Sequence, residues 1–155
     1  MNVTKSLYIH IPFCKDRCSY CDFFSTSLVE QRVPKYMQAL QKDIEAHTAG
    51  HEFDTVFLGG GTPTSISANQ LGEFLSFLTQ TVQMTQSVEF TTEANPGTVD
   101  EEKAAVLKKH GINRVSMGAQ SFHQSVLHEM RRIHTAEQVG ESVKILQAAG
   151  IDNIN

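Results

Sequence analysis

The stretch SLYIHIPFCKDRCSYCDF, residues 6–23, contains every cysteine of the chain: Cys14, Cys18 and Cys21. Its first six residues are β-prone and run directly into the cysteines, which predicts a short strand followed by a loop. A structural zinc site normally has four ligands and a disulfide joins two cysteines, so three thiols spaced C-x3-C-x2-C match neither. We therefore expect the loop to bind a metal group and to leave one position on it open.

Composition and charge exclude several classes of protein. The net charge is −4 and no run of Lys or Arg occurs, so a nucleic-acid partner is not expected. The apolar N-terminal run is short and is interrupted by His10 and Pro12, which predicts neither a signal peptide nor a transmembrane segment. An odd number of clustered cysteines without a secretory signal is typical of a reducing compartment, so we expect a cytoplasmic protein.

Beyond the cysteines, β-prone runs alternate with helical patterns. Strands are predicted at residues 6–11, 53–58, 87–92 and 112–118, with another beginning in the last five residues. Helices are predicted at residues 33–50, from Ser67 through Leu78, from Thr98 to Gly111, around Ser125–Arg131 and from Thr135 to Gly150. The first helix has Val33, Met37, Leu40, Ile44 and His47 at helical spacing, and capping boxes are predicted at Ser67–Gln70, Thr98–Glu101 and Thr135–Gln138. The alternation predicts an α/β fold with a parallel sheet, either open and doubly wound or closing into a barrel.

The predicted strands have one polar and one apolar face. The apolar residues Leu7, Ile9, Val88, Phe90, Val115 and Met117 should pack against helices. The polar phase contains Tyr8, His10, Glu89, Thr91, Glu93, Arg114, Ser116, Gly118 and Gln120. A barrel whose lumen binds a polar ligand fits this alternation, and a sheet with one solvated face is the alternative.

Two metal groups compete for the three cysteines. Clusters of the [4Fe–4S] type that only transfer electrons usually have four cysteines, whereas three cysteines leave one iron open for chemistry. Zinc would need a fourth ligand, for which His10 is the nearest candidate. Zinc ligands usually form two pairs separated by a longer segment, so the spacing favours an iron–sulfur cluster.

The C-x3-C-x2-C motif with Tyr20 before its last cysteine resembles the cluster loop of the radical S-adenosylmethionine superfamily. The segments LYIHIPFCKDRCSYCDF, FLGGGTPT, EANPGT, NRVSMGAQSF and RRIHTAEQ further resemble the oxygen-independent coproporphyrinogen oxidases and their relatives, the HemW-type haem chaperones. The resemblance implies a [4Fe–4S] cluster on the three cysteines, with S-adenosylmethionine at the open iron. It also implies an incomplete (β/α)6 TIM-like barrel. Residues 1–155 would be the N-terminal portion of this core domain, with its first four βα units and the start of the fifth strand, while the rest of the barrel and a C-terminal region would lie beyond them.

The same resemblance assigns cofactor-binding residues. They are Tyr8, Tyr20, Gly60, Gly61, Thr62, Glu93, Gln120 and Arg132. Physical reasons support part of this set, because glycines let a ligand approach bare backbone and a carboxylate attracts the ammonium group of the cofactor. The alternatives are a tight glycine turn, a polar strand end for Gln120 and an exposed helix charge for Arg132. No catalytic residue is assigned, and His10 is expected to be a structural histidine.

This sequence differs from the oxidases in two features that distinguish the chaperones from them. Phe23 stands where the oxidases have an additional cysteine, and only thirteen residues precede Cys14. Both favour a HemW-type chaperone that binds haem in the full-length protein and delivers it to haem-requiring respiratory proteins, with flavodoxin or ferredoxin as an electron donor. The alternative is an oxidoreductase of porphyrin biosynthesis, coproporphyrinogen III dehydrogenase. A zinc or small-molecule binding module is a third possibility.

Overall fold

A parallel sheet forms the centre of the computed structural model, which describes residues 4–155. Its strands, in spatial order, are β1 (Ser6–Ile11), β4 (Glu52–Gly60), β5 (Gln83–Ala94), β6 (Arg114–Met117) and β7 (Asn153–Ile154). Every neighbouring pair is parallel. The predicted α/β fold, with four βα units and the start of a fifth strand, is confirmed.

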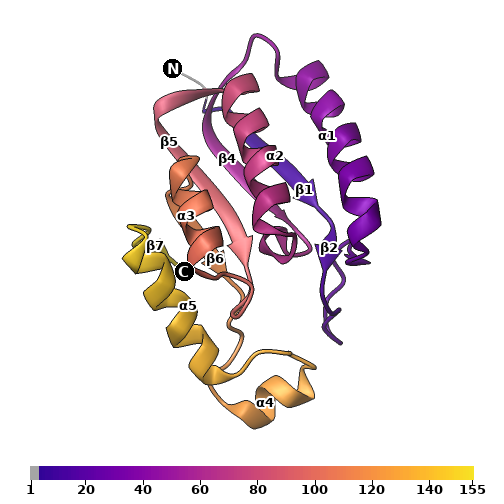
Figure 1. Cartoon of the computed structure of the whole chain (residues 1–155), viewed down its shortest axis with the longest axis vertical. Helices are drawn as coiled ribbons and strands as arrows, with labels where there is room; N and C mark the ends of the chain where they lie inside the picture. Colours follow the sequence, from indigo (N-terminus) through magenta and orange to yellow (C-terminus); the bar gives the residue numbers. More distant parts are fainter. Residues whose placement is uncertain (1–3) are drawn as a thin grey trace.

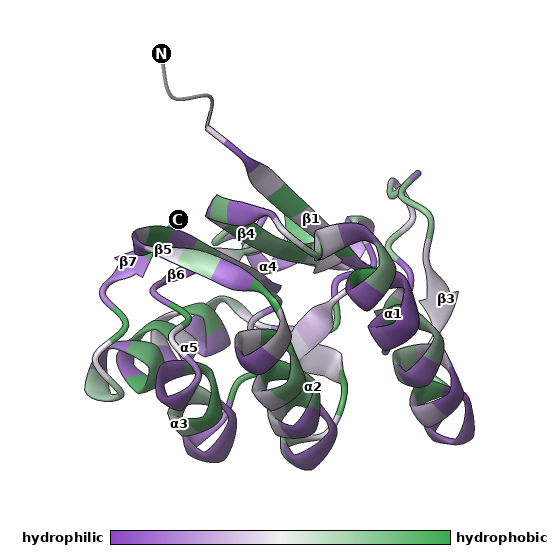
Figure 2. Cartoon of the chain, turned by 90° about the horizontal axis from the view of Figure 1, so that it is seen from above, coloured by the Kyte–Doolittle hydropathy of each residue, from purple (hydrophilic) through white to green (hydrophobic). Residues whose placement is uncertain are grey.

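Helices cover one face of this sheet, as Figure 2 shows. They are α1 (Val33–Thr48), α2 (Ala68–Thr81), α3 (Glu101–Lys109) and α5 (Ala136–Ala148). The short helix α4 (Gln124–Glu129) lies instead beyond the carboxyl ends of the strands, near the loop that follows β1 (Figure 1). This loop contains a second, small parallel sheet of β2 (Phe13–Cys14) and β3 (Thr26–Ser27), which the sequence did not predict. No helix within residues 4–155 has both the length and the apolar character needed to cross a membrane.

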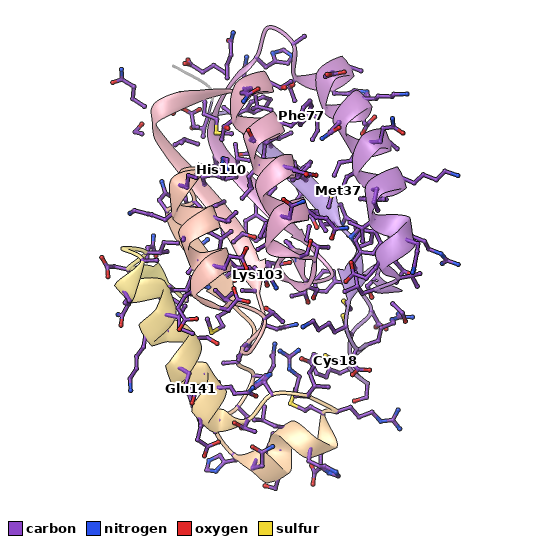
Figure 3. All side chains as sticks on the ribbon, in the orientation of Figure 1. Cys18, Met37, Phe77, Lys103, His110 and Glu141 are labelled. Carbon is purple, nitrogen blue, oxygen red and sulfur yellow. The ribbon has the colours of Figure 1, made fainter. Side chains whose placement is uncertain are left out.

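The core lies between the sheet and the helices. Ile9, Phe90 and Val115 are each at most 2% exposed, as their strand phase predicts. On the helix side, the core includes Met37, Leu71, Phe74, Leu75, Leu107 and Leu146, while Phe77, on α2 in Figure 3, packs half-buried against it. On α1, the helical spacing of the apolar residues is confirmed, whereas the His47 side chain is 74% exposed beside Asp43 and Thr48 occupies the buried position one turn after Ile44.

Helix caps agree with the sequence at two of three sites. Capping boxes at Ser67–Gln70 and Thr135–Gln138 are present. The prediction for Thr98 is wrong, because α3 begins at Glu101 and its N-cap is Asp100, which accepts from the Lys103 backbone N–H at 2.8 Å. The Thr98 hydroxyl donates to the Asn95 carbonyl at 2.6 Å and so stabilises the turn before the helix.

Candidate functional site

A cavity of about 390 Å³ lies where the cysteine loop meets the ends of β4, β5 and β6. All eleven residues predicted for the cofactor site line it: Tyr8, Cys14, Cys18, Tyr20, Cys21, Gly60, Gly61, Thr62, Glu93, Gln120 and Arg132. They come from segments up to 124 residues apart in the chain, counted from Tyr8 to Arg132. The parallel sheet brings them together because its strands all end at the same edge.

The cysteine loop is anchored at both ends. Thr26 N–H donates to the Pro12 carbonyl and Leu28 N–H donates to the Cys14 carbonyl, each at 2.8 Å. All three thiols are free and half-buried, and burial raises the pKa of Cys14 while hydrogen bonds from Thr62 and Ser25 oppose the rise. Within residues 4–155, no three His, Cys, Asp or Glu side chains stand close enough together to hold a single metal ion.

These thiols fit an iron–sulfur cluster in their chemistry. Thiolates are the ligands that such clusters take, and the three cysteines face one cavity large enough for a cofactor. The loop supplies three cysteines, so one iron of a four-iron cluster would have no cysteine ligand from it. The opposite wall of the cavity supplies both bare backbone and a carboxylate.

Packing against β1 and the cysteine loop requires glycine at positions 60 and 61, whether or not a ligand binds there. A Cβ on Gly60 would lie 2.7 Å from the ring of His10, and one on Gly61 would lie 2.6 Å from the backbone of Pro12. Gly60 also has φ +119°, which favours glycine. The segment is not an isolated tight turn: it is the end of β4, held against β1 by a bond from the Gly61 N–H to the Ile11 carbonyl of 2.9 Å.

Glu93 projects into the cavity from the end of β5. Its Oε2 accepts a hydrogen bond from the Gly60 N–H at 2.9 Å. Burial raises the pKa of the Glu93 carboxyl, although this hydrogen bond and nearby His10 act in the opposite direction. A partly buried carboxylate at this position is suited to pair with a cationic group of a ligand.

Both ring nitrogens of His10 have partners. Nε2 lies 2.9 Å from the Phe24 carbonyl, which can only accept, so Nε2 carries the proton. Nδ1 then accepts from the Tyr8 hydroxyl at 3.0 Å. This geometry supports the expectation of a structural histidine, since its ring connects β1 to the end of the cysteine loop.

Arg132 is not an exposed helix charge. It lies between α4 and α5, where Nη1 donates to Cys18 Sγ at 3.0 Å and Nη2 donates to Asn95 Oδ1 at 2.6 Å and to the Gly118 carbonyl. Its Nε is buried and has no hydrogen-bond partner among residues 4–155. Gln120 is exposed at the cavity with φ +64°, an uncommon conformation for a residue with a Cβ.

Several lining residues were not singled out from the sequence as site residues. They are Asn95, Ser116, Met117 and Gly118, together with Asp16, Arg17 and Ser25 of the cysteine loop. Asn95 could have been predicted from the sequence. It is a polar residue directly after β5, and Glu93, two residues earlier, was already a predicted site residue. Behind the cavity, the ammonium of Lys103 donates to the Thr64 and Thr98 carbonyls at 2.9 and 3.0 Å (Figure 3 shows Lys103 on α3).

Helices on one face of a parallel sheet, with free cysteines, a glycine-rich strand end and a carboxylate at its carboxyl edge, define a cofactor-binding α/β protein. The family model for the radical SAM superfamily matches residues 8–155, nearly the whole chain. The chain therefore belongs to the radical SAM superfamily. Membership implies a [4Fe–4S] cluster and S-adenosylmethionine as cofactors.

Several curated proteins are similar in sequence. The chain is 37% identical over 155 residues to "Heme chaperone HemW" of Bacillus subtilis and of Escherichia coli, in each case covering 97% of this chain and 41% of the relative. It is 34% identical to "Oxygen-independent coproporphyrinogen-III oxidase-like protein HemZ" of Bacillus subtilis, covering 97% of this chain and 32% of that protein. The chain thus spans about two fifths or less of the length of these relatives.

Solved structures show the same arrangement. Coproporphyrinogen III oxidase (HemN) from Escherichia coli, described as a radical SAM enzyme, superposes with a TM-score of 0.88 at 27% identity. The match covers 97% of this chain and 36% of that one. Native anSMEcpe with bound AdoMet superposes with a TM-score of 0.65 at 15% identity, covering 97% of this chain and 42% of that one, which concerns the fold alone. The predicted partial barrel of the radical SAM type is confirmed.

Proposed function

We propose that Cys14, Cys18 and Cys21 bind a [4Fe–4S] cluster and that S-adenosylmethionine occupies its open iron. Three free thiols facing one cavity, beside a glycine-rich strand end and a half-buried carboxylate, support this assignment. The other cofactor contacts in the proposal are Tyr8, Tyr20, Gly60, Gly61, Thr62, Glu93, Gln120 and Arg132. Residues 1–155 are, in this proposal, the N-terminal portion of a radical SAM core domain.

Different residues of the cavity would contact different parts of the cofactors. Glu93 would accept hydrogen bonds from the cofactor's ammonium group, and the backbone of Gly60 and Gly61 would meet its methionine end. Arg132 would keep Cys18 oriented through its bond to the sulfur. When bound, the cluster supplies the electron for reductive cleavage of S-adenosylmethionine, and an external donor such as flavodoxin or ferredoxin would replenish it.

We further propose that the full-length protein is a haem chaperone of the HemW type, which delivers haem to haem-requiring respiratory proteins. One observation favours it over an oxidase: Phe23 lines the cavity where the oxidases have an additional cysteine. The names of the relatives with 37% identity agree with this choice. An odd set of free thiols suits a reducing compartment, so we place the protein in the cytoplasm.

Oxidative decarboxylation of coproporphyrinogen III is the second candidate, and the TM-score of 0.88 with HemN favours it. Assays of the full-length protein for haem transfer to an acceptor and for conversion of coproporphyrinogen III distinguish the two. We expect transfer of haem without conversion. Conversion without transfer would replace the chaperone by an oxidoreductase.

A further inference from the structure

Asn95 lies directly after β5, and its side chain joins two segments that contact the cysteine loop. Its Nδ2 donates to Thr62 Oγ1 at 2.8 Å and its Oδ1 accepts from Arg132 Nη2 at 2.6 Å. A guanidinium can only donate, so Oδ1 has to face Arg132 and Nδ2 has to face Thr62. The two neighbours therefore fix the orientation of the amide.

One neighbour of Asn95 donates directly to a cysteine of the loop: Arg132 Nη1 donates to Cys18 Sγ at 3.0 Å. The other neighbour, Thr62, lines the same cavity as the cysteines. Because the Thr62 hydroxyl accepts from Asn95, its own proton remains available for donation. The amide of Asn95 thus orients Arg132 toward the sulfur of Cys18 while Thr62 holds the amide from the other side.

The surroundings leave the amide little freedom. A bond from the Asn95 N–H to Thr98 Oγ1 at 3.2 Å holds its backbone in a turn. On the other side lies Gly118, where a Cβ would come within 2.7 Å of Asn95 Oδ1 and 3.3 Å of Arg132 Nη2. The glycine therefore provides the space in which Asn95 and Arg132 meet.

We propose that Asn95 is a positioning residue that sets the reduction potential of the cluster, by holding Arg132 as a hydrogen-bond donor to the sulfur of Cys18. The inference rests on the proposed cluster site. Hydrogen bonds to the sulfurs are among the factors that determine the potential of an iron–sulfur cluster. They stabilise the reduced state more, because it is the more negative one, so they raise the potential.

Redox titration of the reconstituted full chain, followed by electron paramagnetic resonance under anaerobic conditions, tests the proposal. Asn95→Leu removes both hydrogen bonds of the amide, and Gly118→Ala displaces the amide without removing a polar group. We expect both variants to keep the iron and sulfide content of the wild type and to shift the potential to lower values. Because the two changes differ in kind, a folding defect in one leaves the other as the test.

Asn113→Leu is the matched control. The amide of Asn113 also makes two hydrogen bonds: its Oδ1 accepts from the Phe90 N–H and its Nδ2 donates to the Val88 carbonyl, in the middle of β5 and outside the cavity. Its removal should leave the potential unchanged. A wild-type potential in both test variants, an equal shift in the control, or loss of the cluster from both test variants would overturn the proposal. A wild-type protein that takes up no cluster would overturn the proposed function, and this inference with it.

Discussion

Glu93 combines the charge and the burial that a cation-binding group needs. Glu93→Gln keeps the size of the side chain and an acceptor for the Gly60 N–H but removes the charge. We expect affinity for S-adenosylmethionine to fall by roughly 10- to 100-fold, the value of a charge-assisted hydrogen bond. Isothermal titration calorimetry of the cluster-loaded protein measures it.

Glu89 provides the control for this substitution, because it has the same strand phase but does not line the cavity. Glu89→Gln should keep wild-type affinity, and an equal loss in both variants would contradict the role of Glu93. Burial raises the pKa of Glu93, so affinity should also decline as the pH falls through that raised pKa. The decline should begin at a higher pH than for an ordinary glutamate and should be absent in Glu93→Gln.

His134 makes the stability of the fold depend on pH. It is 2% exposed and its Nε2 donates to the Ala119 carbonyl at 3.0 Å, while burial, with a smaller effect of Arg132, lowers its pKa. The unfolded chain therefore binds the proton more tightly. The stabilisation from neutral His134 is complete above the ordinary pKa of 6.5 and is lost as the pH falls toward the lowered one.

Urea unfolding at pH 7.5 and pH 5 tests this expectation. The free energy of unfolding of the wild type should fall more between the two pH values than that of His134→Gln, which can still donate to the carbonyl but does not titrate. Equal declines would mean that the imidazole titrates alike in the folded and unfolded chains.

Lys103 connects α3 to the segment that follows Gly61, because its ammonium donates to the Thr64 carbonyl there. Lys103→Met would leave the Thr64 and Thr98 carbonyls without their buried donor, at a cost of about 2 kcal/mol in unfolding free energy. Lys109→Met, at an exposed position of the same helix, should change it by less than about 0.5 kcal/mol. Denaturant unfolding compares the two, and an equal effect would show that the buried ammonium contributes nothing specific.

Elements with a strong periodic pattern of apolar residues could be predicted from the sequence. Features that depend on which of two neighbouring residues makes a hydrogen bond could not. The bounds of β1 were predicted as found, because its six residues alternate and a loop signal follows at once. The N-cap of α3 was predicted at the wrong residue because Thr98 and Asp100 both have side chains that can cap a helix. The Thr98 hydroxyl instead bonds to the Asn95 carbonyl, and Asp100 is the N-cap. Pairing of β2 with β3 involves only two residues of each strand, too few to leave a pattern.

The same contrast holds for the site. The eleven residues were predicted from motifs that resemble those of the family, and the structure brings all of them to one cavity. Asn95 belongs to one of those motifs, but its part depends on contacts with Thr62 and Arg132, each 33 or more residues away along the chain. Such contacts follow from the parallel sheet and are not visible in any local pattern.

For the whole molecule, the division into two faces explains where the site lies. Among residues 4–155, the helices α1, α2, α3 and α5 cover one face of the sheet and leave the other face uncovered (Figure 2). Tyr8 and Glu93 line the cavity of the cysteine loop. The polar face is not exposed to water along its whole length. Thr91 is fully buried there, where its hydroxyl bonds to the side chains of Glu89 and Arg114. The cavity therefore forms at the carboxyl edge, where this face meets the cysteine loop.

The most direct test of the account is anaerobic reconstitution of the chain with iron and sulfide, followed by metal analysis and electron paramagnetic resonance with and without S-adenosylmethionine. We expect about four irons and four sulfides per chain, and a signal of the reduced cluster that changes when S-adenosylmethionine is added. Replacing any of Cys14, Cys18 or Cys21 by serine should abolish the signal. A colourless protein that binds one zinc ion per chain would contradict the assignment of a [4Fe–4S] cluster to these cysteines.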